Sequence, residues 1–172
     1  MARLDRETVL TAGIEIADEA GLEAVTLRRI AERLSVTAMA LYRHVGGKDD
    51  LLDGMADLLY AELDLPEVGE GWWEGLAAIA RSTRSVLLAH PWAVPLFSRP
   101  LVGPHAVALG DALELVLRSA GFSKQNALEL HDQLSGMVFA LVALELHGRR
   151  NRAAFERGIE LLRVGLEHRL RS

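Results

Sequence analysis

Residues 26–45 decide the fold, and they read TLRRIAERLSVTAMALYRHV. A residue suited to helix capping precedes each of two short helical stretches, Thr26 before residues 27–34 and Thr37 before residues 38–45. The residues with inward helical spacing are Ile30, Ala31, Leu34, Val36 and Leu41. This pattern predicts two helices that pack together across a tight turn, which leaves one face of the second helix free to enter the major groove of DNA.

The free face of the second helix carries side chains that suit contact with DNA. The residues on or beside it are Thr37, Ala38, Met39, Tyr42, Arg43, His44 and Lys48. The hydroxyls of Thr37 and Tyr42 and the backbone N–H groups at the helix start can bind phosphate oxygens. Arg28, in the first turn of the preceding helix, can bind a guanine edge, and the small or apolar side chains suit thymine methyl groups. An ordinary helical hairpin has no need to expose such a set.

Charge is distributed unevenly along the chain, although the net charge is only −5. Between Thr26 and Lys48 five basic residues stand against one acid, Glu32. Residues 49–74 hold nine acids and no lysine or arginine. A local basic patch attracts a polyanion, but a solvated helix face gives the same pattern, so charge alone leaves both interpretations open.

The N-terminal segment resembles the DNA-binding domain of TetR-family regulators. The matching pieces are LDR at residues 4–6, GLE at 21–23, TLRRIAERL at 26–34, and LY-x-HV at 41–45 followed by Lys48. The resemblance covers roughly residues 3–60. It is close to the tetracycline-repressor-like branch of the family.

The resemblance implies roles for individual residues. Four of them, Thr26, Tyr42, His44 and Lys48, would anchor phosphates, and Arg28 would read a base. Specificity would vary at positions 38, 39 and 43, and Leu27 stands where a hydroxyl residue is common. The predicted DNA-binding residues are therefore Thr26, Leu27, Arg28, Thr37, Ala38, Met39, Tyr42, Arg43, His44 and Lys48. Gly46 and Gly47 replace the polar helix cap usual before Lys48, which predicts a looser loop.

The rest of the chain also predicts helices, because no stretch alternates apolar and polar residues over the length of a strand. Beyond a first helix capped by Asp5 and ended by Gly21, the expected helices are residues 48–63, 72–89, 104–120, 124–147 and 152–171. The fold class is therefore all-α. We expect a helix-turn-helix DNA-binding domain in residues 1–47 and an effector-binding and dimerisation domain in residues 48–172, in which residues 48–64 form a connecting helix.

Apolar residues repeat at steps of four and three along the last two long helices, as in a packing seam. In the TetR family these helices of two subunits form a four-helix bundle, which makes the seam a predicted dimer interface. Its members are Leu130, Leu134, Met137, Leu141, Leu144, Phe155, Ile159, Leu162 and Leu166. A seam buried inside one subunit gives the same pattern. A helix-turn-helix that reads a palindromic operator needs a two-fold partner, which favours the dimer.

A small-molecule site is expected between the helices of the second domain. Apolar walls with a few polar groups suit such a ligand, so we predict a largely apolar effector. The candidate lining residues are Trp92, Phe97, His105, Phe122, His131, Met137 and Phe139. Any one of them is equally compatible with plain core packing. His105 and His131 lack the spacing of a metal site, so neither a metal nor a cofactor is predicted.

Several functional classes are disfavoured by what the sequence lacks. The absence of cysteine excludes disulfides, thiolate metal sites and cysteine nucleophiles. A polar N-terminus and no window near the roughly twenty apolar residues of a membrane span predict a cytoplasmic protein. No phosphate-binding glycine loop or GxSxG motif occurs, so an enzyme is not expected. The resemblance to the TetR family implies a sequence-specific DNA-binding transcriptional repressor that a small-molecule effector releases from a palindromic operator. A helical adaptor that binds protein instead of DNA is the remaining alternative.

Overall fold

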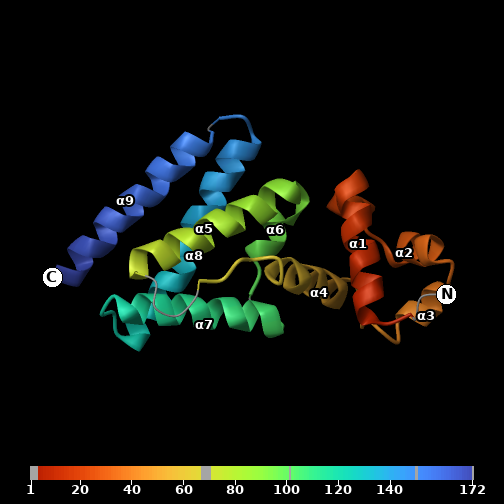
Figure 1. Cartoon of the computed structure of the whole chain (residues 1–172). Helices are drawn as coiled ribbons and strands as arrows, with labels where there is room; N and C mark the ends of the chain where they lie inside the picture. The colour runs from red at the N-terminus through yellow and green to blue at the C-terminus, as the bar shows by residue number, and fades with distance from the viewer. Residues whose placement is uncertain (1–3, 67–70, 101, 150, 172) are drawn as a thin grey trace.

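The computed structural model describes residues 4–66, 71–100, 102–149 and 151–171, and the regular elements in these ranges are all helices (Figure 1). In chain order they are α1 (Arg6–Ala20), the 3₁₀ turn η1 (Leu22–Ala24), α2 (Leu27–Leu34), α3 (Ala38–Leu41), α4 (Lys48–Tyr60), α5 (Trp72–Ala89), the 3₁₀ turn η2 (Pro91–Ala93), α6 (Val94–Phe97), α7 (Pro104–Ser119), α8 (Lys124–Leu146) and α9 (Arg152–Arg171). The predicted all-α fold class is confirmed.

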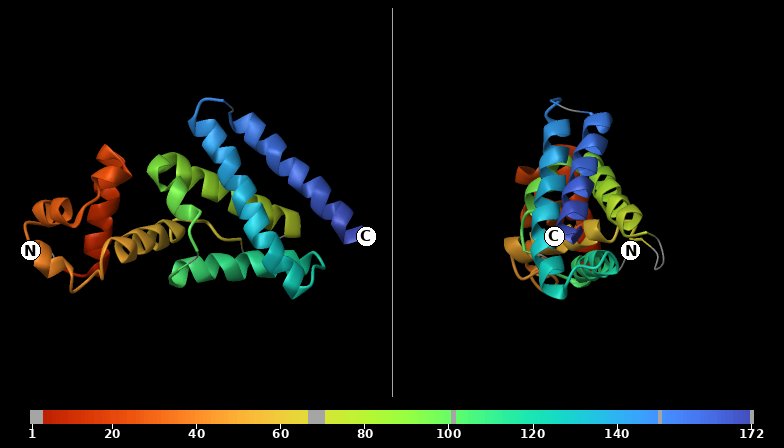
Figure 2. Two further views of the ribbon diagram at one scale, coloured as in Figure 1. Left: turned by 180° about the vertical axis from the view of Figure 1, so that it is seen from behind. Right: turned by 90° about the vertical axis from the view of Figure 1, so that its left-hand side faces the viewer.

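The chain is arranged in two parts joined by α4. Helices α1 to α3 gather at one end, whereas α9 and the C-terminus lie at the other (Figures 1 and 2). On one side α4 packs against α1, and on the other it packs against α6 and α7. A single rigid helix therefore touches both parts of the molecule.

The helix starts follow the caps expected from the sequence. The side-chain oxygens of Asp5, Thr26, Thr37 and Ser123 each accept a hydrogen bond from the backbone N–H three residues later. At the other end of α2, Ser35 adopts a left-handed conformation with φ 54°, which turns the chain sharply toward α3. These local signals set the register of the helical pair.

Two helices are shorter than predicted. The third was expected to reach Val45 but α3 ends at Leu41, and residues 42–44 continue as turns. The fourth was expected to reach Leu63, but α4 ends at Tyr60. The boundary expected between the domains, residues 66–71, lies partly outside the described residues.

Close approach of α1 and α4 holds the N-terminal part of the chain together. A Cβ added at Gly54 would lie 2.7 Å from Leu10 Cδ2, and one at Gly13 would lie 2.9 Å from Met55 Sδ. Only glycine allows the two helices to pack at this distance. The core between them and α2 includes the fully buried Ile30.

Helix α8 is apolar on more than one side. Within the described residues it is long and apolar enough, by length and composition, to cross a membrane, so the expectation that no segment approaches this limit was wrong. This is weak evidence for a membrane span, because α8 packs against α5, α7 and α9. Only 28% of the apolar window is buried within the chain, which leaves much of its surface uncovered.

Candidate DNA-binding surface and ligand cavity

The outer surface of α2 and α3 is polar, basic and exposed. Met39 is 77% exposed and Tyr42 55%, large values for apolar and aromatic side chains. The other predicted residues that are exposed on this surface are Thr26, Arg28, Thr37, Ala38, Arg43 and Lys48. Eight of the ten predicted DNA-binding residues therefore face solvent from one helical pair and the start of α4.

Two of the predicted residues are partly covered. Leu27 is half-buried and packs against the core, so its side chain contributes to folding and only its backbone lies at the start of α2. His44 is also half-buried, and its backbone carbonyl accepts a hydrogen bond of 2.8 Å from Arg6 Nη1. Leu27 and His44 therefore help to hold the fold beneath the exposed surface, and their side chains add little area to it.

Two arginines of this region have different kinds of partner. Arg33 pairs with Glu15 and Glu19 on α1 and so joins α2 to α1. Among the described residues, Arg28 pairs only with Glu32 on its own helix, at 2.9 Å, and both side chains are well exposed. Because an exposed ion pair is weak, Arg28 can exchange this partner for a phosphate or a base.

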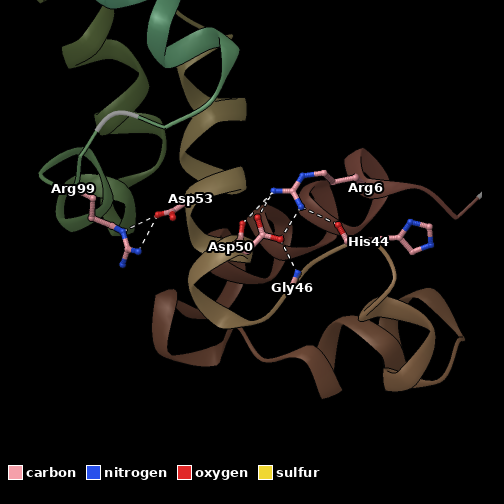
Figure 3. A network of polar contacts seen from close by, with 6 residues as sticks. All are labelled: Arg6, His44, Gly46, Asp50, Asp53 and Arg99. Carbon is pink, nitrogen blue, oxygen red and sulfur yellow. Dashed lines mark hydrogen bonds and ion pairs between the residues drawn. The ribbon is translucent and has the colours of Figure 1, made fainter.

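Asp50, in the first turn of α4, fixes the loop before it (Figure 3). Its two carboxylate oxygens accept hydrogen bonds from Arg6 at 2.7 and 2.9 Å, and Oδ2 also accepts one from the N–H of Gly46 at 2.7 Å. The Arg6 guanidinium, with the Gly46 N–H, lowers the pKa of Asp50 from 3.8 to about 2. The loop at Gly46 and Gly47 was predicted to be loose. The start of α4 has no side-chain cap, but the Asp50 carboxylate holds the Gly46 N–H of this loop.

The same helix contacts the second part of the chain through two further acids. Asp53 binds Arg99, which follows α6, at 2.9 Å (Figure 3). Asp57 Oδ1 accepts hydrogen bonds from the backbone N–H groups of His105 and Ala106 at 3.0 and 2.9 Å and so caps the start of α7. The three acids of α4 thus connect the helix-turn-helix to α6 and α7.

A second junction joins α1 directly to the segment after α5. Asp18 on α1 accepts a hydrogen bond from Trp92 Nε1 at 2.6 Å and contacts His90 Nδ1 at 2.7 Å. His90 Nε2 lies 3.5 Å from Glu62 Oε2, just beyond the end of α4. Residues from three elements therefore meet at one point between the two parts.

A cavity of about 400 Å³ lies among α4, α5, α6, α7, α8 and α9. Its aromatic wall is formed by Tyr60, Trp73, Phe97 and Phe139. Aliphatic residues of α5, α7 and α9 form most of the remainder, and the polar lining residues are Thr83, Ser98, Arg99, His131, Asp132 and Ser135. The volume falls within the range of small-molecule sites.

Three of the seven residues predicted for the effector site line this cavity, namely Phe97, His131 and Phe139. The other four lie elsewhere. Trp92 is held by Asp18, and His105 is exposed at the start of α7. Phe122 is buried in the core, and Met137 is half exposed on the outside of α8. Within the described ranges no group of three potential metal ligands lies together.

The cavity also includes residues that the sequence did not single out. Thr83 is only 5% exposed and is the one hydroxyl residue among the buried positions of α5. Its place at helical spacing between Leu76, Ala80 and Leu87 was a usable signal for a polar group in an apolar wall. Tyr60, whose pKa is raised by burial, was hidden in the apolar run of α4.

Two family models match the chain in the order of its two parts. Residues 9–55 match the bacterial regulatory proteins of the tetR family, and residues 65–169 match the tetracyclin repressor-like C-terminal domain. The chain belongs to the TetR family. Both halves carry the match, so the family assignment covers the ligand-cavity region as well as the helix-turn-helix.

Named TetR-family proteins are similar over most of the chain. An HTH-type transcriptional regulator of Saccharopolyspora erythraea is 37% identical over 83% of this chain, which spans 61% of that relative's length. A TetR variant from Acinetobacter baumannii AYE, solved with minocycline, has a TM-score of 0.85 at 31% identity and covers 99% of each chain. BioQ, solved with its double-stranded DNA operator, has a TM-score of 0.81 at 27% identity, covering 95% of this chain and 98% of BioQ.

The members of the predicted dimer seam differ in how deeply they are buried within the single chain. Five of its members are buried within the single chain, namely Leu130, Leu134, Phe155, Ile159 and Leu166, so in this subunit they form its own core. Leu141, Leu144 and Leu162 are half-buried, and Met137 is half exposed. The apolar side chains left outside on α8 and α9 include Met137, Leu161 and Val164.

Proposed function

We propose that this TetR-family protein is a sequence-specific transcriptional repressor that a small-molecule effector releases from its DNA operator. The observation that carries the proposal is the exposed set of Arg28, Tyr42, Arg43 and Lys48 on a helical pair whose framework is fixed by Arg6 and Asp50. Arginine can read a base edge, whereas lysine and the tyrosine hydroxyl hold phosphates. The role as repressor follows the similarity to named repressors of the family.

The acting species in this proposal is a homodimer on a palindromic operator. A two-fold axis would place two α3 helices about one turn of DNA apart, on successive major grooves. The exposed apolar side chains Met137, Leu161 and Val164 on α8 and α9 supply a surface for the partner subunit. These helices lie at the end opposite the helix-turn-helix, which leaves both DNA-binding surfaces free (Figure 2).

In this proposal the effector releases the protein from DNA by shifting α4. A ligand in the cavity contacts Tyr60 and Arg99, and Arg99 binds Asp53 on α4. A shift of α4 would move Asp50 and the loop that leads from α3, which changes the spacing of the two recognition helices. The ligand can drive this shift only by binding the released state more tightly than the DNA-bound state. We place the protein in the bacterial cytoplasm, where its operator lies.

Selection from random duplexes followed by a mobility-shift series in salt tests the proposal. We expect wild type to enrich one palindromic sequence and to bind it less tightly as salt rises, because phosphate contacts release counterions. Arg28→Ala and Tyr42→Ala should each weaken binding at least about fivefold, from lost contacts of roughly 1–3 kcal/mol. Arg157→Ala, an exposed change on α9, is the matched control and should bind as wild type does.

The same experiment separates the repressor from the helical adaptor. An adaptor enriches no duplex, and its Arg28→Ala variant behaves like wild type toward DNA. Affinity for the enriched duplex that is unchanged by both substitutions would place the DNA contact outside α2 and α3 and would contradict the assignment of this surface.

A further inference from the structure

Two arginines of α5 join this helix to both of the helices that carry the exposed apolar surface. Helix α5 packs against α8 and α9, which also pack against each other (Figure 2). Arg84 donates two hydrogen bonds to Glu145 near the end of α8, from Nε to Oε2 at 2.8 Å and from Nη2 to Oε1 at 2.6 Å. Its guanidinium also lies over the ring of Phe155 on α9, 5.6 Å from the centroid. One side chain of α5 therefore contacts both helices.

The contacts of Arg84 are largely covered by the surrounding chain. The side chains of Arg84 and Glu145 are only 17% and 14% exposed, and Phe155 is buried. The hydrogen-bonded Arg84 lowers the pKa of Glu145, so this carboxylate is charged at neutral pH. A pair with two parallel hydrogen bonds fixes an angle as well as a distance, because guanidinium and carboxylate are both planar. Arg84 thus restricts how α8 can shift or rotate on α5.

Arg81, about one turn earlier on α5, makes a similar contact with α9. Its Nη2 and Nε donate to Glu156 Oε2 at 2.9 and 3.2 Å. This pair is more exposed than the pair of Arg84 and Glu145. An exposed ion pair adds little to the stability of a fold. Its position near the start of α9, however, restrains the rotation of that helix on α5.

The apolar surface proposed for the partner subunit lies on the same two helices. Met137 precedes Glu145 by about two turns of α8. Leu161 and Val164 follow Glu156 within about two turns of α9. Because a helix moves as a rigid element over such a distance, a rotation of α9 at Glu156 also moves Leu161 and Val164. Side chains from both helices must keep their relative positions if the surface is to fit a second copy closely.

We propose that Arg84 and Arg81 are positioning residues for the dimer, which hold α8 and α9 at the angle that their apolar side chains need to meet a second copy of this chain. The inference rests on the homodimer of the proposed function. It assigns a role to residues that lie outside the exposed apolar surface, the DNA-binding surface and the lining of the cavity. Both arginines act through the orientation of α8 and α9, so loss of either pair weakens the dimer while the helices stay folded.

Sedimentation equilibrium of the full chain over a range of concentrations gives the dimer dissociation constant of each variant. Arg81→Glu and Glu156→Arg each bring like charges together, and each should raise the constant at least about tenfold, which corresponds to the lost burial of about one large apolar side chain. The double variant Arg81→Glu/Glu156→Arg restores an opposite pair and should recover most of the wild-type affinity. Arg84→Met should weaken the dimer as the single reversals do. Arg84→Lys keeps the charge but loses the planar fork, so it should weaken the dimer less.

Arg118→Glu and Asp111→Arg on α7 are the matched controls, because they make the same changes of charge at exposed positions outside α8 and α9. Both should dimerise as wild type does, and circular dichroism should show wild-type helicity in every variant. If Arg84→Met does not fold, the more exposed pair of Arg81 and Glu156 still decides the result. A purely structural pair would change the stability of the fold without changing the dissociation constant.

Single reversals that dimerise as wild type does, or a double variant as weak as the single ones, would overturn the proposal. A wild-type chain that is monomeric at all concentrations overturns it together with the dimer of the proposed function. A wild-type dimer that is insensitive to these substitutions overturns the positioning role alone, so the two failures are distinguishable.

Discussion

Asp50 is the residue on which the position of the DNA-binding surface depends most directly. It binds Arg6 from α1 and the N–H of Gly46, and Arg6 in turn binds the carbonyl of His44. One carboxylate therefore ties the start of the chain, the loop after α3 and the first turn of α4 (Figure 3). Loss of that charge should loosen all three together.

Asp50→Asn is expected to lower the free energy of unfolding by about 1 kcal/mol at pH 7, a value reduced for the partial exposure of the pair. The folded-state pKa is about 2, below the ordinary 3.8, so the carboxylate stabilises the fold above pH 4. This contribution is lost as pH falls through about 2. Urea unfolding at pH 7 and at pH 2–4 checks it, and the difference between wild type and variant should shrink in acid. A constant difference, or one equalled by Asp111→Asn, would contradict this role.

Trp92→Phe tests the second junction between the two parts. The substitution keeps a ring but removes the indole N–H that donates to Asp18 at 2.6 Å. We expect a loss of about 1 kcal/mol in urea unfolding, the usual size of one such hydrogen bond. Affinity for a ligand in the cavity should not change, because Trp92 lies outside it. If the variant binds the ligand less tightly but is as stable as wild type, Trp92 must contact the ligand, which would contradict its position outside the cavity.

At this scale the sequence predicted which residues of the helix-turn-helix are exposed better than which residues line the cavity. The helix-turn-helix lies within twenty consecutive residues, so helical spacing alone separates Ile30 and Leu41 from the exposed Tyr42 and Arg43. The direction of Trp92 could not be predicted in the same way, because it lies in a proline-broken segment without a helical period. Its partner, Asp18, is 74 residues away in the chain.

Helix α4 is the element that joins the helix-turn-helix to the part of the chain that holds the cavity. Asp50, Asp53 and Asp57 follow a spacing of three and four residues, which places them along one side of the helix. They bind Arg6, Arg99 and the backbone start of α7. The sequence showed a run of acids after Lys48, but their partners come from α1, α6 and α7 and could only be seen in the folded chain.

Gly103→Ala tests the contact between α4 and α7. Gly103 has φ +110°, and a Cβ there would lie 2.3 Å from Asp57 Cγ. We expect a loss of about 2 kcal/mol in urea unfolding from backbone strain and the displaced Asp57 cap. Gly136→Ala on α8 is the control, because no atom lies within 4 Å of the added Cβ and helix propensity favours alanine. If the two variants unfold alike, the contact has no role in stability.

At the scale of the whole molecule, the proposed second subunit would cover an apolar surface on α8 and α9. Met137, Leu161 and Val164 remain exposed on α8 and α9, although both helices also bury residues in the subunit core. A helix that is apolar on both sides suits a position between its own core and a partner. The heptad-like spacing could not separate the two sides, because Leu130 and Leu134 satisfy it equally while facing inward.

Leu161→Glu is expected to convert the dimer to monomers at micromolar concentration, because it puts a charge into an apolar contact. Sedimentation equilibrium gives the masses, and circular dichroism should show unchanged helicity, since Leu161 is 73% exposed in the single chain. Met39→Lys, at the opposite end of the molecule, is the control and should remain dimeric. A Leu161→Glu variant that stays dimeric would place the interface on another face.

Hydroxyl-radical footprinting of the duplex enriched by the wild-type protein tests the central claim most directly. The structure predicts two protected patches about one helical turn apart, related by the symmetry of the site, with two chains bound per duplex. At the lowest protein concentration that gives full protection with wild type, both patches should weaken together in Arg28→Ala and remain in Arg157→Ala. A single asymmetric patch, protection that is undiminished in Arg28→Ala, or no enriched duplex at all would contradict a dimeric repressor that reads DNA through α2 and α3.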